Sequence, residues 1–114
     1  MRQKLQGKTA ILYRRVSTTD QKENGNSLNR QIHSLRDFAD RNNMTVLREY
    51  QEDYSAKDFE RPEFNKLRSF VRENKKDIDY VLLTNWDRFS RNTYEALGVI
   101  GEMQSLGIEI NCVE

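Results

Sequence analysis

The chain has 114 residues, which suits one domain with one core, and its 19 basic and 18 acidic residues leave a net charge of +1. This balance does not indicate a nucleic-acid-binding protein by itself, although 12 of the basic residues are arginine, whose planar guanidinium suits phosphate binding. The single cysteine, Cys112, excludes an intramolecular disulfide, and together with the single histidine, His33, it excludes a Cys-rich or His-rich metal centre. The sequence has no apolar run of roughly 20 residues and no signal-peptide core, so we expect a cytoplasmic protein without a membrane segment.

Short apolar runs predict strands, and segments with helical spacing of apolar residues predict helices. Residues 1–8 are expected to be a flexible N-terminus. Four strands are expected: at Thr9–Tyr13, at Met44–Glu49, at Tyr80–Leu83, and at the end of the chain, where Ile108, Ile110 and Cys112 alternate with polar residues. Three helices are expected between them: from Leu28 to about Arg41 with Ser27 as N-cap, from Pro62 to the run Glu73–Asp77, and from about Thr93 to a C-cap at Gly107, while a loop from Thr18 to Asn26, an irregular segment at Tyr50–Glu60 and a polar turn at Thr84–Asn92 are expected to connect them. The third helix is expected to bury Tyr94, Leu97, Ile100 and Met103.

This alternation of strands and helices predicts an α/β domain with three layers: a mostly parallel sheet of about four strands, with helices on both faces. Ligands of such sheets bind beyond the carboxyl ends of the strands. Ser17 follows the first strand, Arg61 follows the second, and Asp87, Arg88 and Arg91 follow the third. The topology therefore gathers these side chains at one edge of the sheet.

Ser17 has no histidine at a suitable position, and the sequence has no Gly-x-Ser-x-Gly elbow, so these features argue against a Ser-His-Asp hydrolase. A serine without a base needs another form of activation. Guanidinium groups lower the cost of an alkoxide and stabilise the extra charge on a pentacovalent phosphorus. Arg15, Arg61, Arg88 and Arg91 could supply that environment. Each residue alone is a weak signal, but their order along the chain and their placement at strand ends favour phosphoryl transfer.

Three blocks of the sequence resemble the serine recombinases, the resolvase/invertase family. The first block runs from Tyr13 to Thr18 and continues through Gln21 to Ser27–Gln31; the second contains Tyr54-Ser55-Ala56 and Arg61-Pro62; the third is Asp87–Asn92. The resemblance extends from about residue 8 to residue 114. One departure is Ser55-Ala56, where the family commonly has Ser-Gly.

The resemblance implies a role for each matching residue. Ser17 would be the nucleophile, forming a 5′-phosphoserine link to DNA and releasing a 3′ hydroxyl. Arg15, Arg88 and Arg91 would bind the scissile phosphate with help from Arg61, and Asp87 would hold arginines in position. Gln21 and Gln31 would be polar active-site residues that help position the phosphate or neighbouring groups. Tyr13 would lie at the end of the strand beneath the site and support it, and either Asp53 or Glu52 would be the active-site carboxylate.

The resemblance also implies that neither metal nor cofactor is needed, because the phosphoserine bond conserves the energy for rejoining. Members of the family continue into a long helix that supports dimer and tetramer contacts, and then into DNA-binding domains. We therefore expect residues 9–114 to be a catalytic domain without those parts, whose partners are double-stranded DNA and further copies of the protein. A bacterial, phage or mobile-element origin is expected. The polar segment Tyr50–Glu60 favours the large-recombinase or transposon-integrase branch.

Two other functions remain as alternatives. A non-catalytic α/β phosphate-binding module would bind anions without covalent chemistry, but the sequence has no Gly-x-Gly-x-x-Gly or Gly-Lys-Ser/Thr loop. A metal-dependent nuclease could use Asp87, Glu52 and Asp53, but would leave Ser17 and the arginines without roles.

Overall fold

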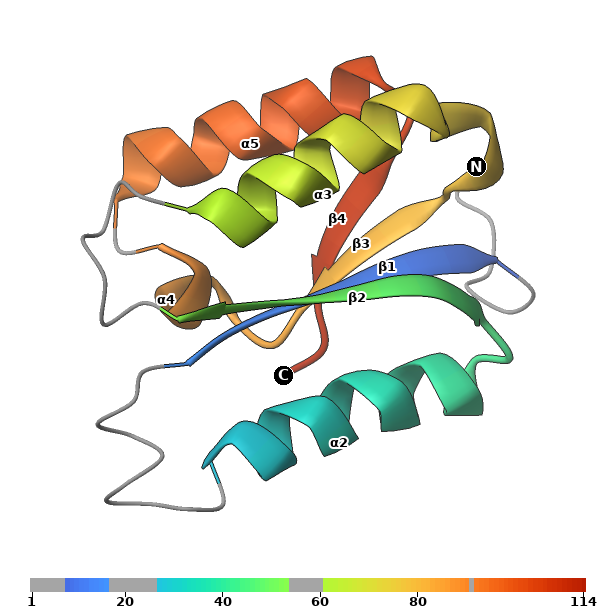
Figure 1. The fold of residues 1–114 in the computed structure, drawn as a ribbon, viewed down its shortest axis with the longest axis vertical. Helices are drawn as coiled ribbons and strands as arrows, with labels where there is room; N and C mark the ends of the chain where they lie inside the picture. Colours follow the sequence, from blue (N-terminus) through green and yellow to red (C-terminus); the bar gives the residue numbers. More distant parts are fainter. Residues whose placement is uncertain (1–7, 17–26, 54–60, 91) are drawn as a thin grey trace.

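A four-stranded parallel sheet forms the centre of the domain (Figure 1). The structure is a computed structural model that describes residues 8–16, 27–53, 61–90 and 92–114. In chain order the elements are β1 (Thr9–Val16), α2 (Ser27–Arg41), β2 (Thr45–Asp53), α3 (Pro62–Glu73), the 3-10 turn η1 (Lys75–Asp77), β3 (Tyr80–Leu83), α4 (Trp86–Phe89), α5 (Thr93–Ser105) and β4 (Glu109–Cys112). The strands lie in the order β2-β1-β3-β4, and all their pairings are parallel. The expected α/β fold is confirmed.

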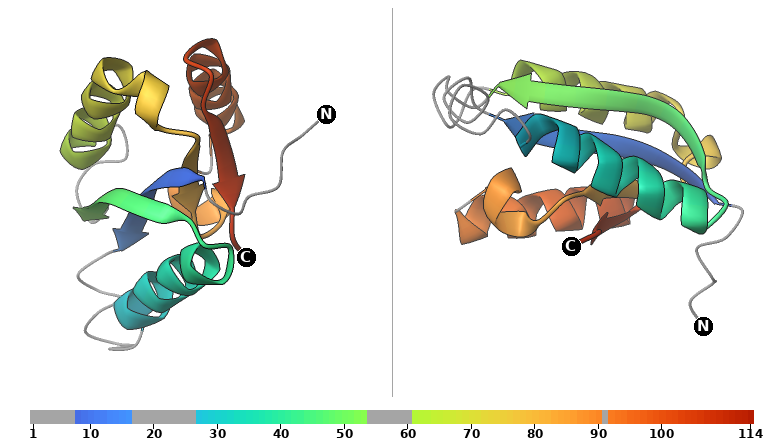
Figure 2. Two further views of the ribbon diagram at one scale, coloured as in Figure 1. Left: turned by 90° about the vertical axis from the view of Figure 1, so that its right-hand side faces the viewer. Right: turned by 90° about the horizontal axis from the view of Figure 1, so that it is seen from below.

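The helices cover both faces of the sheet, with α2 on one face and α3 and α5 on the other (Figures 1 and 2). Successive side chains of a strand point to opposite faces, so β1 serves two apolar layers. Leu12 packs in the layer that contains Leu35 of α2, whereas Ile11 and Tyr13 pack in the layer that contains Phe64 of α3. The three expected layers are therefore present, and β1 lies at their centre.

A β-bulge at Leu47 shifts the alternation of side chains along strand β2. Ala10 of β1 lies opposite Val46, but the next residue of β1 lies opposite Arg48, so the register skips one residue of β2. One extra residue in a strand inverts the facing of every side chain that follows it. Accordingly, Val46 packs on the α2 side of the sheet and Tyr50 packs on the α3 side.

The first two strands are longer than their apolar residues indicate. The expectation that they end at Tyr13 and Glu49 is wrong, because they continue to Val16 and Asp53. The added part is polar, and it is held by backbone pairing between residues 14–16 and residues 51–53. A backbone ladder satisfies its own N–H and C=O groups whatever the side chains are. The expected irregular segment therefore does not begin at residue 50, and its residues 54–60 lie outside the described residues.

The helix starts agree closely with the sequence. Helices α3 and α5 begin at Pro62 and Thr93, as expected, and α2 begins at Ser27, the residue expected as its N-cap. The side chains of Ser27 and Leu28 lie outside the described residues. The expected polar turn after β3 contains one unexpected helical turn, α4. No helix of the described ranges is long and apolar enough to cross a bilayer.

The buried face of α5 differs from the expected one. Tyr94 and Leu97 are 89% and 60% exposed, whereas Val99 and Met103 are buried. An α-helix has about 3.6 residues per turn, so Tyr94 and Met103 are separated by about two and a half turns and lie on opposite sides. Spacing by three residues drifts around the helix, which is why the predicted stripe is wrong at its first two positions.

Candidate active site

The carboxyl edge of the sheet brings the ends of three strands together. β1 ends at Val16, so Ser17 is the next residue, and β2 ends alongside it because Val16 lies opposite Asp53. β3 lies on the other side of β1 and leads into α4, which contacts β1. The order of the sheet reverses at β1, and ligands of open α/β sheets bind at such a reversal.

Phe89, the last residue of α4, contacts two of the arginines that were predicted for the site. Its backbone carbonyl accepts a hydrogen bond from Nη1 of Arg15 at 3.0 Å. Its ring lies under the guanidinium of Arg61, whose Cζ is 4.6 Å from the ring centroid. Arg15 and Arg61 are both buried, although one comes from the end of β1 and the other directly precedes α3. Phe89 therefore joins two distant segments of the chain at the carboxyl edge.

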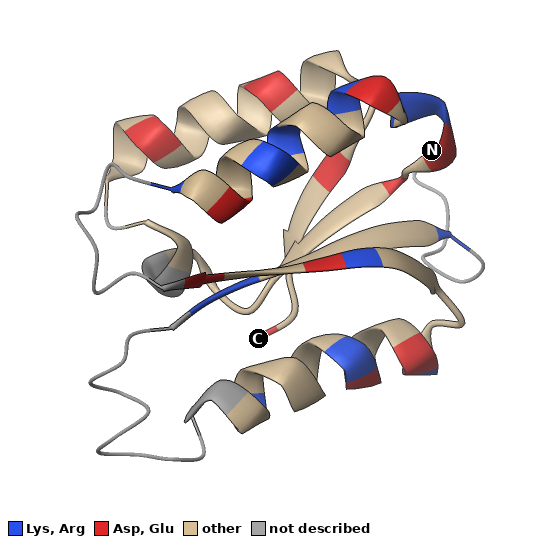
Figure 3. Cartoon of the chain, viewed as in Figure 1, with Lys and Arg blue, Asp and Glu red and all other residues tan. Residues whose placement is uncertain are grey.

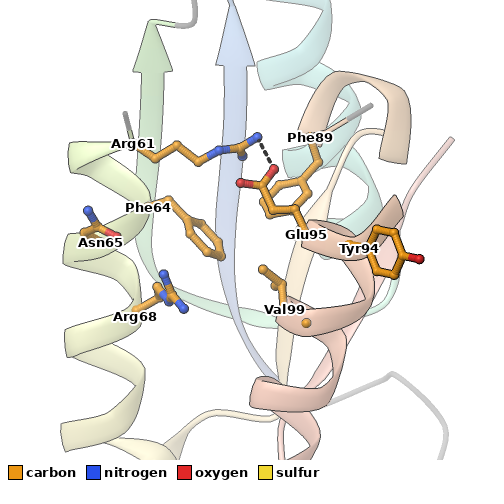
Figure 4. Close-up of a pocket in the computed structure, with 9 residues that line it drawn as sticks. Arg61, Phe64, Asn65, Arg68, Phe89, Tyr94, Glu95 and Val99 are labelled. Carbon is orange, nitrogen blue, oxygen red and sulfur yellow. Dashed lines mark hydrogen bonds and ion pairs between the residues drawn. The ribbon is translucent and has the colours of Figure 1, made fainter. Parts of the chain in front are cut away.

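Arg61 is held between α3 and α5, at one end of a cavity of about 320 Å³ (Figure 4). Its Nη2 donates a hydrogen bond to Oε1 of Glu95 at 2.9 Å, and its side chain is only 6% exposed. Phe64 and Val99 line the same cavity. Within the described part of the chain, Arg61 thus lies against the Phe89 ring and pairs with one carboxylate, and in this buried environment a cation is strongly attracted to an anion.

Tyr13 and Glu52 lie beside these arginines in the buried layer. The Tyr13 hydroxyl donates a hydrogen bond to Oε1 of Glu52 at 3.0 Å. Burial, followed by the Glu52 carboxylate, raises the pKa of the Tyr13 phenol well above its usual range, while Arg61 and Arg15 act in the opposite direction. Tyr13 is therefore a neutral hydrogen-bond donor in the buried layer that also contains Phe64.

Glu52 also caps helix α3. Its carboxylate accepts hydrogen bonds from the backbone N–H groups of Glu63 and Phe64, at 3.2 and 3.0 Å. The residue at the N-cap position, Arg61, makes no side-chain capping bond, so Glu52 supplies the acceptor that the helix start needs. A carboxylate that is 2% exposed and accepts these bonds is suited to a structural task rather than to metal binding.

Gln31 reaches the same edge from α2. Its Nε2 donates to the backbone carbonyl of Arg15 at 3.4 Å, and its Oε1 accepts from the hydroxyl of Thr84 at 3.3 Å. These bonds connect the end of β1 to the residue that follows β3. Gln31 therefore lies with the predicted site residues, on the α2 side of β1.

The remaining predicted residues cannot be placed in the same detail. Ser17, Gln21 and Arg91 lie outside the described residues, and so do the side chains of Asp53, Asp87 and Arg88. The backbone of residues 87 and 88 forms part of α4, and that of residue 53 ends β2. Within the described part of the chain, no group of three or more His, Cys, Asp or Glu side chains could hold a metal ion.

Two residues of this site are absent from the sequence-based prediction. Phe89 reads as an ordinary apolar residue, and its carbonyl carries no sequence signal. Glu95 follows Asn92 by three residues, a spacing typical of a helix capping box, and Asn92 does accept a bond from the Glu95 N–H at 3.2 Å. The carboxylate of Glu95 pairs with Arg61, which no local pattern indicates.

Comparison with known proteins shows the family of this chain. The family model described as the resolvase N-terminal domain matches residues 10–114. The chain belongs to the resolvase family of serine recombinases. A protein named resolvase from Clostridium perfringens is 33% identical over 103 residues, which is 90% of this chain and 47% of that protein. The chain thus spans about half the length of the curated relatives it matches.

Solved structures of this family have the same fold. The N-terminal catalytic domain of TP901-1 integrase has a TM-score of 0.80 at 30% identity, over 93% of this chain and 78% of that one. A resolvase family site-specific recombinase from Streptococcus pneumoniae has a TM-score of 0.77 at 29% identity, over 92% and 71%. The C-terminal catalytic domain of ISC1926 TnpA, an IS607-like serine recombinase, has a TM-score of 0.74 at 29% identity, over 93% and 67%. The chain therefore has the fold of a serine recombinase catalytic domain.

Proposed function

We propose that this chain cuts and rejoins double-stranded DNA at specific sites through a covalent bond to Ser17. The observation that carries the proposal is the convergence of Arg15 and Arg61 on Phe89, at the edge of the sheet where β1 ends one residue before Ser17. Two buried guanidinium groups at the end of the strand that precedes this serine form an environment for a phosphodiester and for the charge that develops on it.

In the proposed reaction, the Ser17 oxygen attacks the scissile phosphorus and the bond to the 3′ oxygen breaks. The proton lost by the serine is balanced by the proton that the 3′ oxygen gains, so the products are a 5′-phosphoserine link and a free 3′ hydroxyl. After strand exchange, a 3′ hydroxyl attacks the phosphoserine and releases Ser17. Each step exchanges one phosphoester for another, so it consumes neither a nucleotide nor an oxidant.

The arginines have separate parts in this proposal. Arg15 and Arg61 stabilise the phosphate from their buried positions, and Arg88 and Arg91 complete its binding from the segment that contains α4. Asp87 orients these arginines, whereas Gln21 and Gln31 position neighbouring groups. Asp53, at the end of β2, is the proposed active-site carboxylate because Glu52 is engaged with α3.

Site recognition belongs, in our proposal, to a further part of a longer protein. The net charge of +1 leaves this chain without the basic excess that non-specific DNA affinity requires. The proposed protein acts as a dimer that pairs into a tetramer, so that four strands are cut and exchanged together.

The test uses the longer protein, with its DNA-binding part, and a duplex that contains its recombination site. Cleaved intermediates are trapped and digested, and the DNA-linked peptide is identified by mass spectrometry. We expect the adduct on Ser17, complete loss of cleavage in Ser17→Ala, and normal cleavage in Thr18→Ala, which removes the neighbouring hydroxyl. Cleavage should also persist in a chelator. An adduct on another residue, or cleavage by Ser17→Ala, would refute the mechanism, and sensitivity to chelation would favour a nuclease.

A further inference from the structure

Helix α5 has two charged residues, Glu95 and Glu102 (acidic positions are red in Figure 3). Both pair with arginines of α3 or of the residue that precedes it. They are seven residues apart, so they lie on nearly the same face of the helix. Glu102 binds Arg68 at 2.7 Å and Arg72 at 2.9 Å, and the side chains of these arginines are 37% and 56% exposed. Glu95 differs because its partner, Arg61, is buried.

The local structure of α5 prepares Glu95 for this contact. Asn92 caps the helix by accepting the Glu95 N–H, which fixes the first turn. The positive end of the helix dipole favours a carboxylate in that turn. With its backbone held by Asn92, the Glu95 side chain extends towards Arg61 (Figure 4), and it is itself one third exposed.

Among the described residues, Arg61 pairs with one carboxylate, that of Glu95. Its Nε and Nη1 atoms are buried and have no hydrogen-bond partner among the described residues. A buried cation that is incompletely paired is costly, so removal of Glu95 would favour a different side-chain position. The Phe89 ring attracts the guanidinium but offers no hydrogen-bond acceptor in its plane.

We propose that Glu95 is a positioning residue that holds Arg61 at the reaction site, a role that rests on the proposed recombinase function. Glu95 binds Nη2 and fixes the guanidinium over Phe89, and it leaves Nε and Nη1 as the donors for a phosphate oxygen. Glu95 does not touch DNA in this arrangement. It acts through Arg61 alone.

The matched control is Glu102. Glu102→Gln also removes a carboxylate that joins α5 to α3, but it leaves Arg61 and Phe89 untouched. If Glu95 were only a structural tie between two helices, then Glu95→Gln and Glu102→Gln would have similar effects. If Glu95 positions Arg61, only Glu95→Gln will affect the cleavage step.

The experiment measures DNA affinity and the single-turnover cleavage rate at saturating DNA for each variant of the longer protein. We expect Glu95→Gln to slow cleavage about tenfold or more, because a charge-assisted bond to Arg61 becomes a weaker neutral one, while the Kd for DNA changes less than about twofold. Glu102→Gln should stay within about twofold of wild type in both quantities. In an Arg61→Ala background, Glu95→Gln should cause no further loss, because the residue through which it acts is absent.

The two proposals fail in different ways. If the wild-type protein forms no Ser17 adduct, the proposed function fails and this role falls with it. If the adduct forms normally but Glu95→Gln cleaves at the wild-type rate, or no more slowly than Glu102→Gln, the role of Glu95 alone is refuted. A further loss from Glu95→Gln in the Arg61→Ala background would also refute it.

Discussion

The carboxylate of Glu52 at the end of β2 accepts a hydrogen bond from the backbone N–H of Phe64 in the first turn of α3, at 3.0 Å. This bond joins two elements across the segment that connects them in the chain. Arg61 is the N-cap residue of α3 and also contacts Phe89. The Glu52 carboxylate therefore fixes the start of α3 and, with it, the backbone of Arg61.

Glu52→Ala should destabilise the domain strongly. It leaves the buried Tyr13 hydroxyl, the buried N–H of Phe64 and the partly buried N–H of Glu63 without their acceptor, so we expect a loss of about 2–4 kcal/mol in the free energy of unfolding. Chemical denaturation followed by circular dichroism measures this loss. Ser69→Ala, at an exposed position of α3, should change stability by less than about 0.5 kcal/mol. Equal effects of the two substitutions would contradict the capping role.

Tyr13 should make the fold sensitive to alkali. Burial and the Glu52 carboxylate raise the pKa of its phenol in the folded state, whereas the unfolded phenol titrates near its usual value of about 10. As the pH rises above about 10, the unfolded chain releases this proton and the folded chain retains it, so stability falls by up to about 1.4 kcal/mol per pH unit. Tyr13→Phe should remove this part of the slope.

Denaturant midpoints between pH 9 and pH 11 measure that slope. Tyr94→Phe provides the matched control, because it removes the hydroxyl of an 89% exposed tyrosine and should keep the wild-type slope. An unchanged slope in Tyr13→Phe would show that Tyr13 is not protected from ionisation.

Arg61→Lys should impair cleavage although the charge is kept. Lysine lacks the planar group that stacks on Phe89 while it binds Glu95, so we expect a loss of about tenfold or more in the cleavage rate. The measurement is single-turnover cleavage in the longer protein. Arg72→Lys, a similar change at an exposed position on α3, should remain close to wild type. A normal rate in Arg61→Lys would mean that charge alone is sufficient.

The buried face of α5 that the structure shows predicts how substitutions on this helix change the free energy of unfolding. Met103→Ala removes a fully buried side chain and should cost about 2–4 kcal/mol, whereas Tyr94→Ala should change the free energy of unfolding by less than about 0.5 kcal/mol. Thermal and chemical unfolding of both variants provide the comparison. A large loss of stability in Tyr94→Ala would instead support the buried face of α5 that was expected from the sequence.

The fold could be predicted from sequence where local patterns agree with the tertiary structure. The run Tyr80–Leu83 is continuously apolar and forms a central strand with the expected bounds. Pro62 marks the start of α3 because its fixed φ suits the first helical turn. Patterns fail at the polar ends of β1 and β2, whose pairing depends on a neighbouring strand far away in sequence.

In the candidate site, too, features that depend on local sequence could be predicted, whereas contacts between residues far apart in the chain could not. Arg15 and Arg61 could be selected because chain order places them near strand ends, whereas Gln31 was selected through the resemblance to the serine recombinases. The structure brings the segments of Arg15 and Arg61 together at Phe89 and joins Gln31 to Arg15. The pairing of Arg61 with Glu95 could not be foreseen, because residues 34 positions apart meet only when α3 and α5 pack on the same face. The capping function of Glu52 was hidden for the same reason.

The skipped residue at Leu47 has a consequence for how this domain tolerates sequence change. Leu47 is partly exposed, so many side chains could replace it at little cost. Its deletion would remove the bulge and join Val46 directly to Arg48, which already lies opposite Ile11, so the residues after it would keep their present faces. Glu52 would still face α3 and accept the N–H groups of its first turn. Related chains should therefore vary at this position both in the identity of the residue and in whether it is present.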